Sequence, residues 1–92
     1  MMRVRVYGTL RQLVGTWDVH VEGAAGDTVR EVVHRLVAAF PGLEERVLDD
    51  QGRLRPAVNI FVRGRSIRFI DGLDTVLQEG EDLALFPPVA GG

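Results

Sequence analysis

Apolar and polar residues alternate with a period of two in two short segments near the start of the chain, residues 3–7 and 17–22. This period is typical of strands that bury one face and expose the other. In the second segment, Trp17, Val19 and Val21 occupy the apolar side. We therefore predict two strands, and their closeness in the sequence predicts that they pair with each other.

The next segment has the spacing of an amphipathic helix. Thr28 followed by Glu31 forms a capping box, in which each side chain satisfies a free backbone N–H at the helix start. Pro41 ends the helix, and shorter helical turns are predicted over residues 9–15 and 43–48. The apolar residues of the main helix recur every three or four positions: Val29, Val32, Val33, Leu36, Val37 and Phe40.

The second half of the chain predicts three more strands. Residues 57–64 are rich in β-branched and aromatic side chains, which predicts a strand buried on both faces. Residues 66–72 predict a short strand, and a turn at residues 79–81 leads into a last strand, Leu83–Phe86. One long helix can cover only one face of such a sheet. We predict an α+β fold of the β-grasp type: a hairpin, a crossover helix and a strand parallel to the first.

The length of 92 residues is enough for a single domain. We expect a β-grasp domain over residues 1–86 and an extended C-terminal tail over residues 87–92. No stretch of about 18 apolar residues is present, and the first residues lack the apolar core of a signal peptide. These features lead us to expect a cytoplasmic protein without a membrane segment.

Two residue types are missing. The chain contains no cysteine, which excludes a disulfide, a thiol nucleophile and an iron–sulfur cluster of its own. All 11 basic residues are arginine, so no lysine can form a Schiff base or accept a conjugated protein. The net charge of −2 argues against a general nucleic-acid-binding protein.

No arrangement of polar residues predicts a catalytic centre. His20 and His34 have no second ligand or nucleophile at a suitable spacing, and the paired carboxylates lie next to glycines, where turns explain them. The chain has neither a plausible Ser-His-Asp set nor a glycine-rich phosphate loop. We expect no metal site and no active site of its own.

A cluster of arginines lies in a stretch that contains no acidic residue: Arg53, Arg55, Arg63, Arg65 and Arg68. One interpretation is a solvated sheet edge that discourages aggregation. The other is a docking face for an acidic partner protein, in which Arg63, Arg65 and Arg68 bind the partner. Both interpretations remain open from the sequence.

The last seven residues, "FPPVAGG", have an unusual composition for the end of a chain. Phe86 ends the last strand, and the two prolines that follow cannot continue a sheet and favour an extended chain. Glycine lacks a side chain, so the last residues can pass through a channel too narrow for any Cβ. We expect the tail to deliver its terminal carboxylate into another protein's active site, threading through it with Val89, Ala90, Gly91 and Gly92.

A terminal carboxylate of this kind can be activated and made to carry sulfur. Joining the Gly92 carboxylate to AMP gives it a good leaving group, which sulfide or a partner's persulfide can displace to leave a thiocarboxylate. The missing cysteines and lysines remove internal thiols and side-chain amines that would attack the activated terminus. A GC-rich genome that favours arginine explains the missing lysines equally well.

The motifs "VYGTLRQLVGT" and "FPPVAGG" resemble those of the MoaD/ThiS sulfur carriers, the ubiquitin-like proteins that end in Gly-Gly. The resemblance covers essentially the whole chain, and its longer middle is similar to the branch that holds CysO and the small archaeal modifiers. It implies that a ThiF/MoeB-like enzyme consumes ATP to adenylate Gly92 and that the carrier itself binds no cofactor. It also implies docking through Tyr7 and Phe86, with Phe61 or Val62 as weaker matches.

The resemblance leaves the destination of the sulfur open. We favour a CysO-type carrier for a pyridoxal-phosphate-dependent cysteine synthase, with a metallopeptidase that releases the cysteine. The second possibility is the small subunit of molybdopterin synthase, which would bind the large subunit. Rival functions are a modifier joined through Gly92 to lysines of target proteins, and a non-covalent interaction module.

Overall fold

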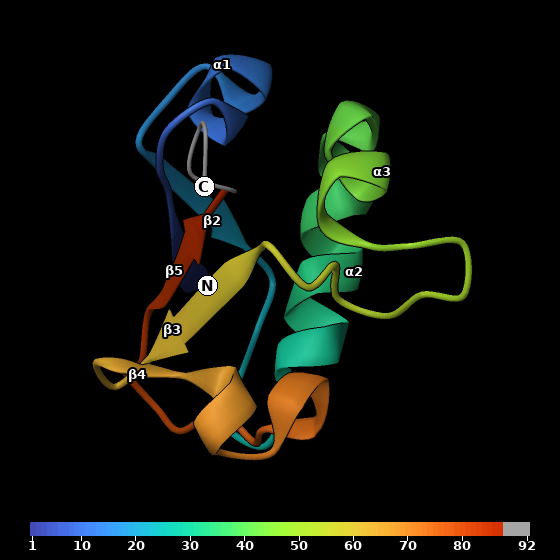
Figure 1. Cartoon of the computed structure of the whole chain (residues 1–92). Helices are drawn as coiled ribbons and strands as arrows, with labels where there is room; N and C mark the ends of the chain where they lie inside the picture. The colour runs from blue at the N-terminus through green and yellow to red at the C-terminus, as the bar shows by residue number, and fades with distance from the viewer. Residues whose placement is uncertain (88–92) are drawn as a thin grey trace.

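Five strands form one mixed sheet in the computed structural model, which describes residues 1–87 (Figure 1). The strands in spatial order are β2 (Asp18–Val21), β1 (Met2–Val6), β5 (Leu83–Phe86), β3 (Asn59–Val62) and β4 (Arg65–Ser66). The central strand β5 is parallel to β1 and antiparallel to β3, and the outer strands β2 and β4 pair antiparallel with β1 and β3. This is the predicted β-grasp topology, and the strand parallel to the first is the last one.

One long helix, α2 (Val29–Ala39), packs against a single face of the sheet (Figure 1). The short helix α1 (Leu10–Val14) follows β1, and α3 (Glu44–Val47) follows α2. Gly15 closes α1 in the left-handed conformation, with φ of 86°, and its N–H donates to the carbonyl of Arg11. Three 3₁₀ turns complete the described chain: Pro41–Leu43, Ile67–Phe69 and Gly72–Asp74.

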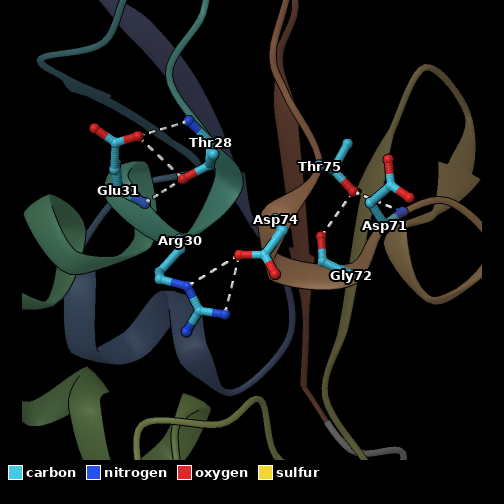
Figure 2. Close-up of polar contacts among 7 residues, drawn as sticks. All are labelled: Thr28, Arg30, Glu31, Asp71, Gly72, Asp74 and Thr75. Atoms are coloured by element: carbon cyan, nitrogen blue, oxygen red, sulfur yellow. Dashed lines mark hydrogen bonds and ion pairs between the residues drawn. The ribbon is translucent and has the colours of Figure 1, made fainter.

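The start of α2 carries the predicted capping box. The Glu31 N–H donates to Thr28 Oγ1, and the Thr28 N–H donates to Glu31 Oε1, at 3.3 and 3.1 Å (Figure 2). Arg30 on the same turn reaches Asp74 of the last 3₁₀ turn at 3.2 Å. The Arg30–Asp74 ion pair and the bond from the Val29 N–H to the Thr75 carbonyl join the helix to the chain that leads into β5.

Thr75 is a buried polar residue, only 1% exposed, and its hydroxyl is fully used. Its Oγ1 donates to the carbonyl of Gly72 at 2.7 Å and accepts from the Asp71 N–H at 3.1 Å (Figure 2). A buried hydroxyl without partners would cost about 1–3 kcal/mol. The two bonds remove that cost and fix the last 3₁₀ turn.

The core lies between the sheet and α2. Every second residue of each strand points into it, including Val4, Ile60 and Leu85, each 1% exposed. Fully burying a side chain of this size contributes roughly 1.5–3 kcal/mol. Because no second layer of residues 1–87 covers the other side of the sheet, that face stays open.

Three local predictions differ from the structure. The strand β3 is buried on one face only, because Asn59 is exposed and Phe61 half-buried on the open face. The strand expected over residues 66–72 stops after Ser66, whose Oγ accepts from the Arg68 N–H and turns the chain into a 3₁₀ turn. Trp17 lies before β2 and is 55% exposed, so it does not share the buried side of that strand.

Candidate docking face and tail base

The open side of the sheet carries a shallow hollow of about 510 Å³. Its centre is Ala84 of β5, a small residue between larger neighbours. The strand register explains this arrangement, because Ala84 pairs with Arg5 on one side and Phe61 on the other. Residues from three stretches of the chain line the hollow: Arg5, Tyr7, Phe61, Arg63, Gly64, Gly80, Glu81, Asp82, Ala84 and Phe86.

Four aromatic rings form a row across one end of this face. Phe86 stacks on Tyr7 with ring centroids 4.6 Å apart and an interplanar angle of 6°. Phe61 meets Phe86 edge to face at 5.4 Å, and Trp17 meets Tyr7 edge to face at 6.1 Å. We call these four residues the aromatic row. Aromatic side chains that are partly exposed and rigidly placed are the usual anchors of protein interfaces.

The aromatic row lies at the end of the sheet where the tail begins. The Tyr7 N–H donates to the carbonyl of Leu85 at 3.0 Å, which fixes the first strand against the last. Pro87 then packs against Gly8, whose φ is 61° and where an added Cβ would lie 2.6 Å from the Pro87 Cγ. The base of the tail is therefore held against the residue that follows Tyr7.

Ion pairs lie at the end of the hollow that is away from the aromatic row. Arg63 donates to Glu81 at 2.7 Å, and Arg5 lies 3.9 Å from Asp82. Arg3 lies outside the lining of the hollow. It donates to Asp18 at 2.9 Å, and this hydrogen bond, together with the carboxylate charge, raises the pKa of Arg3 above its usual value. These pairs neutralise most of the charge around the hollow and leave its aromatic end as the apolar part.

The structure brings together three of the predicted partner-binding residues, Tyr7, Phe61 and Phe86. Val62 is 0% exposed and points into the core, so its side chain is not available to a partner. Its inclusion in the predicted docking set was wrong, because the alternation of β3 places consecutive residues on opposite faces. The predicted tail residues lie outside the described residues: Val89, Ala90, Gly91 and Gly92.

The predicted arginines have different surroundings. Arg63 lines the hollow but is already paired with Glu81. Arg65 donates to the carbonyl of Phe69 at 3.3 Å, in the 3₁₀ turn that follows β4. Arg68 donates to Asn59 Oδ1 at 2.7 Å and to a neighbouring backbone carbonyl. Arg65 and Arg68 have no carboxylate within 4.0 Å among residues 1–87, so they retain net positive charge for a partner.

Trp17 and Arg11 join this site, although the sequence did not indicate it. The guanidinium carbon of Arg11 lies over the Trp17 ring, 3.6 Å from its centroid. The alternating pattern assigned Trp17 to the buried side of a strand. The only available signal was the position of this large aromatic residue directly before the strand, next to a turn.

The two histidines, His20 and His34, are exposed, as expected for surface residues. Within residues 1–87, no three His, Asp or Glu side chains converge as metal ligands. The same part of the chain holds no helix with the length and apolar character that a membrane crossing requires.

The sequence of residues 4–92 matches the model of the ThiS family. The chain belongs to the ThiS family. This match covers nearly the whole domain and continues through the last residue of the tail.

Three relatives illustrate the range of the family. Small archaeal modifier protein 3 of Haloferax volcanii is 35% identical over 91 residues, which cover 99% of this chain and 98% of the relative. The sulfur carrier protein CysO of Mycobacterium tuberculosis is 39% identical over 71 residues, 75% of this chain and 76% of the relative. The molybdopterin synthase sulfur carrier subunit of Arabidopsis thaliana is 25% identical over 91 residues, 99% and 82% of the two chains.

Solved structures agree with the β-grasp topology. The crystal structure of SAMP1 from Haloferax volcanii superposes with a TM-score of 0.87 at 34% identity and covers 99% of this chain and 98% of the other. The crystal structure of the Amycolatopsis orientalis BexX/CysO complex gives a TM-score of 0.84 at 28% identity and covers 100% of both chains. In that crystal structure CysO is in complex with BexX.

Proposed function

We propose that this chain is a sulfur carrier that acts through its C-terminal glycine and has no active site of its own. One observation carries the proposal. The aromatic row and Pro87 lie at the same end of the open face, so a partner that recognises the rings also receives the tail. The membership of the ThiS family, whose match includes residues 87–92, supports the same use of the tail.

The proposed reaction has two steps. A carboxylate oxygen of Gly92 attacks the α-phosphorus of ATP in a ThiF/MoeB-like enzyme, and pyrophosphate leaves. Sulfide then attacks the acyl carbon, AMP leaves, and the product is a terminal thiocarboxylate. The carrier contributes no catalytic group and binds no cofactor. It supplies the surface that places the tail in the enzyme.

The open face suits this role on physical grounds. Its rings hold one another in place, because Phe86 contacts both Tyr7 and Phe61, and Tyr7 also contacts Trp17. Rigid aromatic anchors lose little conformational entropy on binding. Its flanking arginines, Arg65 and Arg68, favour a partner surface that carries carboxylates.

Mass spectrometry of the intact protein tests the proposal. The untagged chain is incubated with ATP, sulfide and the adenylating enzyme of the same organism. The expected result is a mass gain that corresponds to replacement of one oxygen by sulfur, localised to Gly92. An unchanged mass, with an enzyme that is active on another carrier, would contradict the proposal.

The destination of the sulfur divides the proposal into two branches. We favour a pyridoxal-phosphate-dependent cysteine synthase as the acceptor, because the CysO similarity is the stronger of the two at 39% against 25% identity. In this branch a metallopeptidase releases the cysteine. Incubating the thiocarboxylate with a cysteine synthase or with the large subunit of molybdopterin synthase distinguishes the branches by which enzyme consumes it.

A second candidate function is that of a protein modifier. The specific support is the 35% identity over 99% of this chain to small archaeal modifier protein 3. A modifier would be joined through Gly92 to lysines of its targets. Because this chain has no lysine, it cannot form side-chain-linked chains of itself. Gly-Gly remnants on lysines of other proteins, absent after deletion of the carrier gene, would support this function.

A further inference from the structure

An arginine stacked on an exposed tryptophan extends the aromatic row beyond Tyr7. Trp17 is 55% exposed, which is unusual for so large an apolar side chain, and one face of its ring carries the guanidinium of Arg11. A cation–π contact of this kind uses none of the N–H donors of the arginine. Stacking therefore fixes the position of the cation and leaves its donors available.

The charge of Arg11 has no compensation within the described chain. No carboxylate of residues 1–87 lies within 4.0 Å of its guanidinium, and none of its side-chain N–H groups donates to another group there. By contrast, Arg63 and Arg5, which line the other end of the hollow, are paired with Glu81 and Asp82. Arg11 thus places an uncompensated positive charge at the aromatic end of the open face.

The position of Arg11 links it to the tail. Arg11 lies in α1, its backbone N–H donates to the carbonyl of Gly8, and Gly8 is the residue against which Pro87 packs. Figure 1 shows α1 at the same end of the molecule as the end of β5. Any enzyme that takes up the tail must therefore approach this helix closely.

We propose that Arg11, held on Trp17, recognises a carboxylate on the adenylating enzyme and so determines which enzyme accepts the tail. The inference rests on the proposed function and adds a specificity contact to it. The partner site that fits is an apolar pocket for the aromatic row with an Asp or Glu at its border. An arginine with free donors binds a carboxylate through two parallel hydrogen bonds, a geometry that lysine cannot reproduce.

The test measures ATP–pyrophosphate exchange by the adenylating enzyme of the same organism as a function of carrier concentration. Arg11→Gln is compared with Arg46→Gln, a matched control. Arg46 is exposed in α3 and also lacks a carboxylate within 4.0 Å among residues 1–87. Both substitutions remove one positive charge, so an effect of net charge alone would be equal in the two variants.

For Arg11→Gln we expect KM for the carrier to rise about tenfold at low salt, with kcat unchanged within about twofold. Arg46→Gln should leave both constants unchanged. Trp17→Ala should raise KM at least as much as Arg11→Gln does, because it frees the guanidinium and also removes one ring of the aromatic row. Trp17→Phe should retain most of the affinity. Arg11→Lys, which keeps the charge, should recover only part of the loss.

The outcomes distinguish a failure of the proposed function from a failure of the role proposed for Arg11. If the wild-type chain supports no exchange, the proposed function fails and this inference fails with it. If the wild type is active and Arg11→Gln has the same KM as Arg46→Gln, the proposed function stands and the role of Arg11 is refuted. Equal salt dependence of KM for the wild type and Arg11→Gln would refute it as well, since a lost ion pair must weaken that dependence.

Discussion

The stacked pair of Tyr7 and Phe86 allows a direct test of whether the aromatic row serves binding or only packing. Both rings are half-buried on the open face. Phe86→Leu removes two ring contacts, one at 4.6 Å to Tyr7 and one at 5.4 Å to Phe61. If the rings only stabilise the fold, the substitution changes stability alone. If they dock a partner, it also changes the affinity for that partner.

The expected loss of stability follows from the two contacts. Each aromatic pair contributes about 0.5–1.5 kcal/mol beyond the area that it buries, so the free energy of unfolding should fall by about 1–3 kcal/mol. A loss of 2 kcal/mol, roughly the middle of that range, lowers Tm by roughly 10 °C in a domain of this size. Small domains have about 5–15 kcal/mol in total, so the variant remains folded at 25 °C.

Urea denaturation and pyrophosphate exchange are measured on the same preparations. A double-mutant cycle with Tyr7→Leu should give a coupling of about 1 kcal/mol between the two rings. The KM for the adenylating enzyme should rise about tenfold or more, as expected for an anchor at an interface. Phe69→Leu is the control for stability, because Phe69 is 76% exposed and should change it by less than about 0.5 kcal/mol.

An unchanged KM in Phe86→Leu, together with the full loss of stability, would refute the docking role and leave the rings as packing residues. An unchanged stability would refute the estimate of the ring contacts instead. The two measurements therefore test separate steps of the reasoning.

Three further predictions concern the tail, the start of helix α2 and the loss of stability at low pH. Gly92→Ala should nearly abolish thiocarboxylation in the mass assay while the circular dichroism spectrum stays unchanged. Thr28→Ala should lower the free energy of unfolding in urea by about 1 kcal/mol, because the Glu31 N–H loses its capping oxygen. The hydrogen bond from Arg35, helped by a backbone N–H, lowers the pKa of Asp27, so its contribution is present at neutral pH and is lost as pH falls below the usual Asp range. Asp27→Asn should therefore flatten the decrease in Tm between about pH 5 and pH 2.

Local chemistry made some elements predictable from the sequence. The capping box of α2 depends on two residues three positions apart, so the sequence of a single helical turn is enough to predict it. The last strand was equally clear, since a turn and a proline bound it. The β-grasp order followed from the sequence of elements, because few topologies place one helix on a sheet of this kind.

The docking face needed information that no local pattern holds. Its rings come from the residue after β1, from β3 and β5, and from the segment before β2, and only the spatial order of the strands brings them together. The apolar sequence of β3 also does not show which of its residues lies on the open face, so the sequence could not decide between Phe61 and Val62 as the docking residue. Once pairing with β5 is known, Phe61 opposes Ala84 on the open face and Val62 must be in the core.

The parallel pairing of β1 with β5 explains why recognition and delivery of the tail occur at one place. Parallel neighbours end at the same edge of a sheet, so the residue after β1 and the residue after β5 must be close to each other. Tyr7 and Gly8 follow β1, Pro87 follows β5, and the bond from the Tyr7 N–H to the Leu85 carbonyl connects the two ends directly. A partner that binds the rings thereby fixes the starting point of the tail without contacting the tail itself. An antiparallel last strand would have placed that starting point at the far edge of the sheet, away from the aromatic row.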